Sequence, residues 1–135
     1  MFGYTRMGPA TGGRKTFLYF AGAFNFGAAL ILVVLARFAP HLLGVDAPSA
    51  SQLLYVDLTA LLVVGFGIGY VLGGRDLERF WPFLSLGALG KASVAALALL
   101  YFVSGDTGAL VMLLAAGDAV FAVLFVRLLR AHAVG

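Results

Sequence analysis

The sequence contains no cysteine, so the chain forms no disulfide, thiolate metal site or cysteine redox centre. Its two histidines, His41 and His132, lie outside the long apolar runs, so neither is placed to bind haem inside a bilayer. The sequence also shows no Cys/His cluster typical of zinc or copper, no phosphate-binding loop and no Ser–His–Asp arrangement. These absences predict no metal and no cofactor, and they favour a protein that is not an enzyme over one that is.

Charged residues are scarce as well, at 11% of the chain, whereas hydrophobic residues make up 62%. A soluble domain has about 25% charged residues and about half apolar ones. The apolar residues form four runs, each about as long as the ~20 residues that a helix needs to cross a bilayer. We therefore predict an all-α integral membrane protein, an antiparallel four-helix bundle that forms one transmembrane domain over residues 1–135. Its helices are expected at residues 16–37, 52–74, 80–103 and 107–130.

Lysine and arginine are distributed unevenly between the two sides that four crossings create. One side carries only Arg37. The other side carries Arg6, Arg14, Lys15, Arg75, Arg79, Arg127 and Arg130. Because basic loops stay in the cytoplasm, this asymmetry predicts that both termini are cytoplasmic. The richness in Ala and Gly is typical of a bacterial protein, which predicts the bacterial inner membrane, with lipid rather than nucleic acid as the partner.

Aromatic residues near the ends of the runs are typical of the belts that anchor helices at a membrane surface. We expect Tyr19, Tyr70 and Trp81 at the cytoplasmic surface, and Tyr55 and Tyr101 at the outer one. These residues are therefore assigned to anchoring rather than to chemistry.

Four polar residues interrupt the apolar runs: Asn25, Asp57, Lys91 and Asp118. Counted from the same side at 1.5 Å per residue, three of them lie roughly 14–17 Å deep, near the midplane, whereas Asp57 lies nearer the outside. A lone Lys or Asp at the centre of a membrane helix costs about 2.5–3.5 kcal/mol, so we expect the three midplane side chains to face inward and pair. In this interpretation Lys91 is a cationic anchor, Asp118 its counter-charge and proton acceptor, and Asn25 a hydrogen-bond partner. Asp57 is then an outer relay or gate.

Small residues flank the three midplane residues at helical spacing, as they do on faces where membrane helices pack closely. On the second run Gly65, Gly69 and Gly73 recur every four residues, with Asp57 on roughly the same stripe. We expect this glycine stripe to pack helices inside the bundle. The alternative is that the stripe binds another protein.

Several short motifs lie on these faces of the predicted helices. They are Gly22-x-x-Asn25, Asp57 followed by Gly65-Phe-Gly-Ile-Gly-Tyr70, Leu86-Gly-x-x-Gly-Lys91 and Gly117-Asp118. In these motifs, which extend over most of the chain, the sequence resembles the small four-helix bacterial membrane proteins of the DoxX-like kind. The resemblance implies a four-helix bundle and supplies neither a substrate nor a catalytic residue. Some members of that group are linked to redox or quinone-coupled complexes, but this chain shows no matching redox residue.

Two functions follow from the sequence as hypotheses. In the first, Asn25, Lys91 and Asp118, with Asp57, bind a small polar or anionic ligand or conduct a proton, as in a transporter. In the second, the chain is an accessory structural subunit of a larger respiratory or photosynthetic complex, in contact with lipid, quinone or carotenoid. The expected partners are the lipid bilayer and either such a complex or further copies of the chain. A purely structural role of the Lys91–Asp118 pair, which would fix the register of the helices, is a further alternative.

Overall fold

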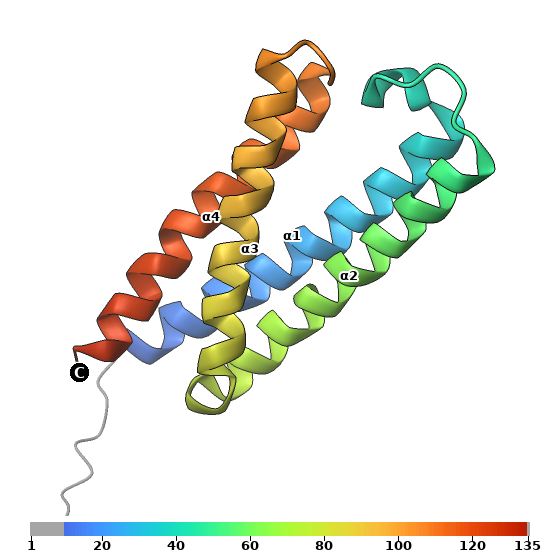
Figure 1. Ribbon diagram of the computed structural model, residues 1–135. Coiled ribbons are helices and arrows are strands. Elements are labelled where there is room, and N and C mark those ends of the chain that lie inside the picture. The colour runs from blue at the N-terminus through green and yellow to red at the C-terminus, as the bar shows by residue number, and fades with distance from the viewer. Residues whose placement is uncertain (1–9, 135) are drawn as a thin grey trace, which may run out of the picture.

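The computed structural model describes residues 10–134, which form four long α-helices and one short 3-10 helix (Figure 1). They are α1 (Ala10–Phe38), η1 (Pro40–Leu43), α2 (Ala50–Arg75), α3 (Leu77–Val103) and α4 (Ala109–Ala133). Each of the four α-helices is long and apolar enough to cross a bilayer. The predicted all-α, four-span architecture is confirmed, and the apolar helices are in contact with lipid.

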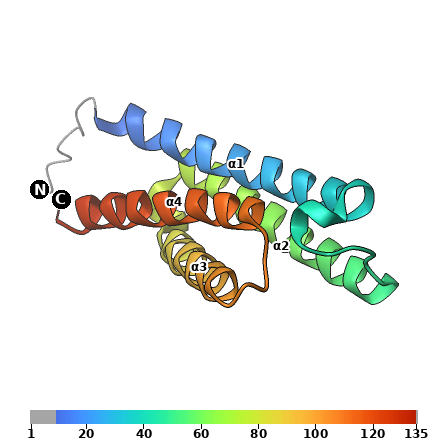
Figure 2. The ribbon, with the colours of Figure 1, turned by 90° about the horizontal axis from the view of Figure 1, so that it is seen from above.

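The helices pack as two antiparallel pairs. Helix α1 lies against α2, helix α3 lies against α4, and a tight turn at Asp76 joins the two hairpins. Figure 1 shows the hairpins close together near this turn and diverging toward the other end. The view from above places the first turns of α1 and the last turns of α4 at the same end (Figure 2).

The two ends of the bundle differ in charge. We call the end with the α2–α3 turn the basic end, and the end with η1 and the α3–α4 turn the loop end. The described basic side chains at the basic end are Arg14, Lys15, Arg75, Arg79, Arg127 and Arg130. Arg37 lies at the loop end, and Arg6 lies outside the described residues.

Side-chain caps set where α2 and α3 begin. The Ser49 hydroxyl accepts a hydrogen bond from the N–H of Gln52, and the Gln52 side chain accepts one from the N–H of Ser49, which forms a capping box. The Asp76 carboxylate accepts a hydrogen bond from the N–H three residues later, at 3.1 Å. Because of this cap, α3 begins at Leu77, ahead of its predicted start at residue 80.

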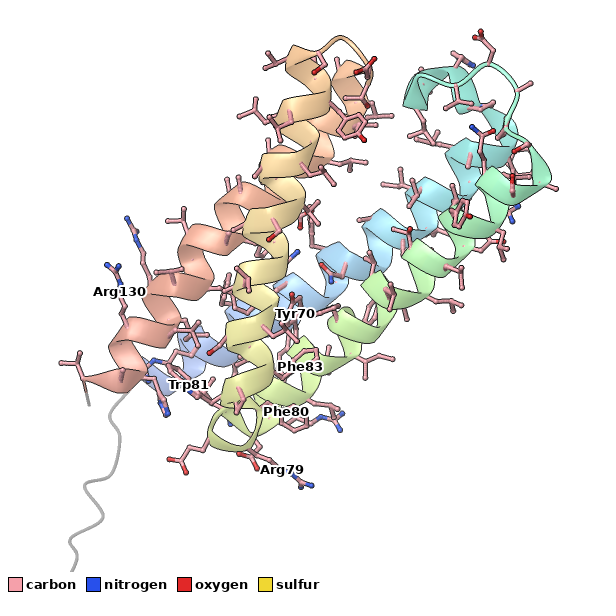
Figure 3. All side chains as sticks on the ribbon, in the orientation of Figure 1. Tyr70, Arg79, Phe80, Trp81, Phe83 and Arg130 are labelled. Carbon is pink, nitrogen blue, oxygen red and sulfur yellow. The ribbon has the colours of Figure 1, made fainter. Side chains whose placement is uncertain are left out.

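The packed core lies in the half of the bundle nearer the basic end. All four α-helices contribute buried side chains to it, namely Leu18, Ala21, Tyr70, Leu84, Ala88, Phe125 and Leu128. The rings of Tyr70 and Phe125 lie 4.8 Å apart between their centroids. Figure 3 shows Tyr70 and Phe83 directed into the bundle, whereas Arg79 and Arg130 project away from it.

The half nearer the loop end is packed more loosely. The described hydrophobic residues that are buried in this half are all alanines: Ala29, Ala36, Ala60 and Ala115. At the loop end itself the hairpins meet again, where η1 contacts α4. There the carbonyl oxygen of Leu42 lies 3.3 Å from the position that a Cβ at Gly108 would occupy. The space between these two contacts is the region where the site lies.

Glycines allow α1 and α2 to approach closely. A Cβ at Gly22 would lie 3.0 Å from the carbonyl oxygen of Gly67 and 2.8 Å from the side chain of Val71. A Cβ at Gly67 would lie 2.6 Å from the ring of Phe26. Real Cβ atoms do not approach other atoms this closely, so larger residues at these positions would push the two helices apart.

Candidate ligand-binding site

Asn25, Lys91 and Asp118 come from three different helices and meet inside the bundle. The Lys91 Nζ donates hydrogen bonds to Oδ1 of Asp118 at 2.5 Å and to Oδ1 of Asn25 at 2.8 Å. Each residue lies well inside its helix, and Asn25 and Lys91 are each only 5% exposed. The contact that the sequence predicts among these three side chains is confirmed.

A further hydrogen bond extends this contact to the remaining helix. The Asn25 Nδ2 donates to the carbonyl oxygen of Val63 in α2 at 3.1 Å. Since an ammonium group only donates, the Asn25 oxygen must face Lys91, and its NH₂ group is left to donate to the carbonyl. One chain of hydrogen bonds therefore joins all four α-helices, and it gives each buried polar side chain a partner.

Three aromatic rings surround the ammonium group of Lys91. Its Nζ lies 5.1 Å from the ring centroid of Phe24, 5.3 Å from that of Phe121 and 5.7 Å from that of Tyr70. Ring faces at such distances attract a cation and supplement the ion pair. Tyr70 is only 1% exposed, so its predicted place in the aromatic belt is wrong.

The aromatic rings fit against glycines of the opposing helices. A Cβ at Gly87 would lie 2.7 Å from the hydroxyl oxygen of Tyr70, and one at Gly117 would lie 2.6 Å from the ring of Phe24. In the sequence, these glycines precede Lys91 and Asp118 by four residues and one residue. The positions of these glycines in the sequence indicate free space beside the polar groups. The packing of the helices shows which aromatic rings fill this space.

An open groove of about 360 Å³ extends from these residues toward the loop end, where the hairpins diverge. All four α-helices line it, with Phe24, Asn25, Ala28, Ala29, Leu32, Thr59, Leu62, Val63, Phe66, Tyr70, Gly87, Gly90, Lys91, Val94, Leu114 and Asp118. Leu62 of α2 is 68% exposed and Val94 of α3 is 51% exposed. The groove therefore opens sideways between α2 and α3, toward the lipid.

Asp118 supplies the accessible charge at the inner end of the groove. Its Oδ1 accepts from Lys91, and no residue in the described part of the chain donates to its Oδ2. The Asp118 side chain is 21% exposed, compared with 6% for the Lys91 side chain. A molecule in the groove would therefore meet more of the carboxylate than of the ammonium group.

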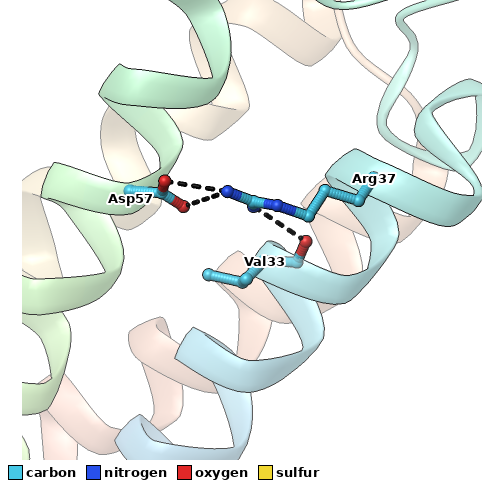
Figure 4. Close-up of polar contacts among 3 residues, drawn as sticks. All are labelled: Val33, Arg37 and Asp57. Carbon is cyan, nitrogen blue, oxygen red and sulfur yellow. Dashed lines mark hydrogen bonds and ion pairs between the residues drawn. The ribbon is translucent and has the colours of Figure 1, made fainter.

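Asp57 lies apart from these residues and pairs with Arg37 (Figure 4). The Arg37 Nη2 lies 2.9 and 2.8 Å from the two carboxylate oxygens, and its Nη1 donates to the carbonyl oxygen of Val33 at 3.3 Å. Six residues of α2, about 9 Å of helix, separate Asp57 from Val63. The pair ties α1 to α2 near the loop end, and the structure does not bring Asp57 into the midplane contact.

The Arg37–Asp57 pair should contribute little to stability. We expect Asp57→Asn to lower the free energy of unfolding by about 1 kcal/mol or less, because both partners are about a third or more exposed. Reversible unfolding in bicelles measures this loss, with the wild-type chain as the reference. A loss of about 3 kcal/mol or more, as for a buried pair, would contradict an exposed and weak Arg37–Asp57 pair.

The predicted glycine stripe divides into two parts. A Cβ at Gly69 would overlap the ring of Phe83, and one at Gly73 would lie 3.1 Å from a leucine side chain of α3. Gly65 is exposed, and nothing lies within 4 Å of the position of its Cβ. On this turn of α2 the glycine in close contact with another helix is Gly67, which the stripe omits.

The fold and the site together define the class of protein. Within residues 10–134, no group of three or more His, Cys, Asp or Glu side chains is placed to hold a metal ion. No family model, no curated protein and no solved structure matches the chain. The chain is a four-span helical membrane protein with a buried contact among Asn25, Lys91 and Asp118. The four-span architecture is the part of the DoxX-like resemblance that the structure supports.

Proposed function

We propose that the chain binds a small, largely apolar molecule from the bilayer, with the polar head of that molecule at the Asn25–Lys91–Asp118 contact. The groove is the main observation that supports this proposal, because its inner end is polar, its walls are mostly apolar and its open side faces lipid. Small-molecule sites typically have about 300–1,000 Å³ and a few polar groups set in apolar walls. The groove of about 360 Å³ fits this description.

The position of the polar contact favours binding over a purely structural role. A buried ion pair adds little net stability, because the cost of desolvation offsets the attraction. A pair that only fixed the register of the helices would need no open space beside it. Here Asp118 is partly exposed at the boundary between the packed core and the groove, where a bound molecule can reach it.

Gly90 also fits the interpretation of the groove as a binding site. It lines the groove, and nothing lies within 4 Å of the position that its Cβ would occupy. Glycine inside a helix costs about 1 kcal/mol relative to alanine, and no packing contact requires it here. A larger residue would extend into the groove, so glycine at this position keeps the groove open.

We also propose that the basic end faces the cytoplasm of a bacterial cell, with both termini on that side of the inner membrane. The basic side chains gathered at the basic end, against Arg37 at the loop end, support this orientation. The groove then lies in the outer half of the bilayer, so the molecule it binds would come from the outer leaflet.

The test uses three photoactivatable probes of equal chain length: a dodecanol, a dodecanoate and a dodecylamine, each with a diazirine close to its head. With the chain in lipid nanodiscs, we expect saturable labelling of residues such as Phe24 and Leu114, mapped by mass spectrometry.

Gly90→Leu should lower this labelling at least about tenfold, because the leucine occupies the groove. The matched control is Gly27→Leu, at an open position of α1 outside the groove, which should label like wild type. Absence of labelling by all three probes, or full labelling of Gly90→Leu, would overturn the proposal.

A second candidate function is that of an accessory subunit, and the exposed Gly65 favours it. Small residues on the outer face of a membrane helix allow a partner helix to approach closely. In this case a partner should co-purify with the wild-type chain in a fixed ratio in mild detergent and be lost from Gly65→Leu. The same behaviour of both chains, each without a partner, would argue against this function.

A further inference from the structure

Building on the binding function proposed above, we propose that the head of the bound molecule is neutral and donates a hydrogen bond to Asp118, as an alcohol or a phenol does. This narrows the ligand class that the sequence leaves open, which includes anions. Three features of the site lead to it: the enclosure of Lys91, the free oxygen of Asp118 and the balance of charge.

Lys91 is largely enclosed and already paired with an anion. Two of its N–H groups donate to Asp118 and Asn25, and three aromatic rings lie within 6 Å of its nitrogen. The residue is 5% exposed. The Asp118 carboxylate already lies at 2.5 Å from Nζ, so a second anion beside Lys91 would be repelled by that carboxylate.

Asp118 presents an acceptor to the groove. Its Oδ1 is engaged by Lys91, whereas its Oδ2 receives no hydrogen bond from the described residues. An ionised carboxylate oxygen accepts hydrogen bonds and donates none. The complementary group on the ligand is therefore a donor, such as a hydroxyl group.

The balance of charge selects a neutral donor over a charged one. Lys91 and Asp118 carry opposite charges that cancel across the ion pair. A bound carboxylate would leave one negative charge in excess, and a bound ammonium would leave one positive charge. Excess charge is costly in a site bordered by hydrocarbon. A hydroxyl group keeps the net charge at zero and still supplies the hydrogen bond.

The walls of the groove accommodate the rest of such a molecule. Leu62, Phe66 and Val94 are apolar residues that line the same groove as Asp118, and Leu62 of α2 and Val94 of α3 are exposed. A hydrocarbon chain attached to the hydroxyl group can lie against these residues and continue into the lipid. The class of ligand is therefore a membrane-dissolved alcohol or phenol with an apolar tail.

The three matched probes test this directly on the full chain in nanodiscs. We expect the dodecanol to reach half-maximal labelling at a concentration at least about tenfold below those of the dodecanoate and the dodecylamine. Preferential labelling by the dodecanoate or the dodecylamine would overturn the inference and leave the binding function standing. Labelling by none of the probes would overturn the binding function itself.

Two variants show whether charge sets this preference. Asp118→Asn leaves Lys91 unbalanced, so the preference should shift toward the dodecanoate by at least about tenfold. The double variant Lys91→Gln/Asp118→Asn is neutral again and should reject both charged probes, as the wild-type chain does. Continued rejection of the dodecanoate by folded Asp118→Asn would overturn the inference. If Asp118→Asn does not fold, the double variant alone serves as the test. Equal binding of all three probes to the double variant would then overturn the inference.

Discussion

Replacement of Lys91 by methionine is expected to lower the free energy of unfolding by about 3 kcal/mol. Loss of one member of a buried ion pair typically costs 3–5 kcal/mol, because the other charge stays buried without a partner. The lower end of that range applies because the Asp118 side chain is 21% exposed. Methionine is similar to lysine in length and is apolar, so the packing against the surrounding rings should change little.

A double variant separates the unpaired charge from other effects of the substitution. In Lys91→Met/Asp118→Leu neither charge is left, and more than half of the lost stability should return. Unfolding in bicelles, measured for the wild-type chain, both single variants and the double variant, gives the coupling free energy of the pair. Equal losses in Lys91→Met and in the double variant would show that the lysine matters for its packing and not for its charge.

Replacement of Gly67 by leucine is expected to cost about 3 kcal/mol as well, for a steric reason. A Cβ at this position would already lie 2.6 Å from the ring of Phe26 and 3.2 Å from the Cβ of Asn25. Overpacking of a tight interior typically costs 1–3 kcal/mol, and here the helix itself must shift. The shift would also lengthen the hydrogen bond from Asn25 to Val63.

The matched control is Gly65→Leu, two residues away on the exposed side of the same helix. No atom lies within 4 Å of its Cβ position, so the substitution should be neutral or stabilise α2 by up to about 1 kcal/mol through helix propensity. Thermal unfolding of the two variants in the same detergent distinguishes these outcomes. If Gly65→Leu were the more damaging of the two, the orientation of α2 would be wrong.

The sequence predicts the contact of Asn25, Lys91 and Asp118 for two reasons. It gives the depth of each residue in the bilayer, and it gives the free-energy cost of leaving a charged side chain against lipid. Each residue is counted from a helix end, and a charge facing lipid is too costly to leave unpaired. The sequence also predicts four spans, since length and apolar content suffice for that. These inferences need no knowledge of which helices are neighbours.

Other features depend on how the helices turn and pack. Four residues rotate an ideal helix by about 400°, so a four-residue glycine stripe drifts about 40° per step, and Gly65 faces away while Gly73 faces α3. Faces toward lipid and faces toward the core are both apolar, so neither the burial of Tyr70 nor the groove can be predicted from hydropathy. Asp57 pairs with Arg37 because both residues lie near the loop end. Counting residues from the helix ends to estimate depth does not predict this pairing.

Solid-state NMR in bilayers reports on the meeting of Lys91 with Asp118 inside the bundle. Lys15→Arg leaves Lys91 as the only lysine in the chain, so a ¹⁵Nζ label reports on that residue alone. With ¹³Cγ-labelled aspartate, we predict strong dipolar dephasing of the Lys91 signal, which Asp118→Asn abolishes, because Nζ and Oδ1 lie 2.5 Å apart. A Lys91 signal without dephasing would place the ammonium group away from Asp118 and contradict the site.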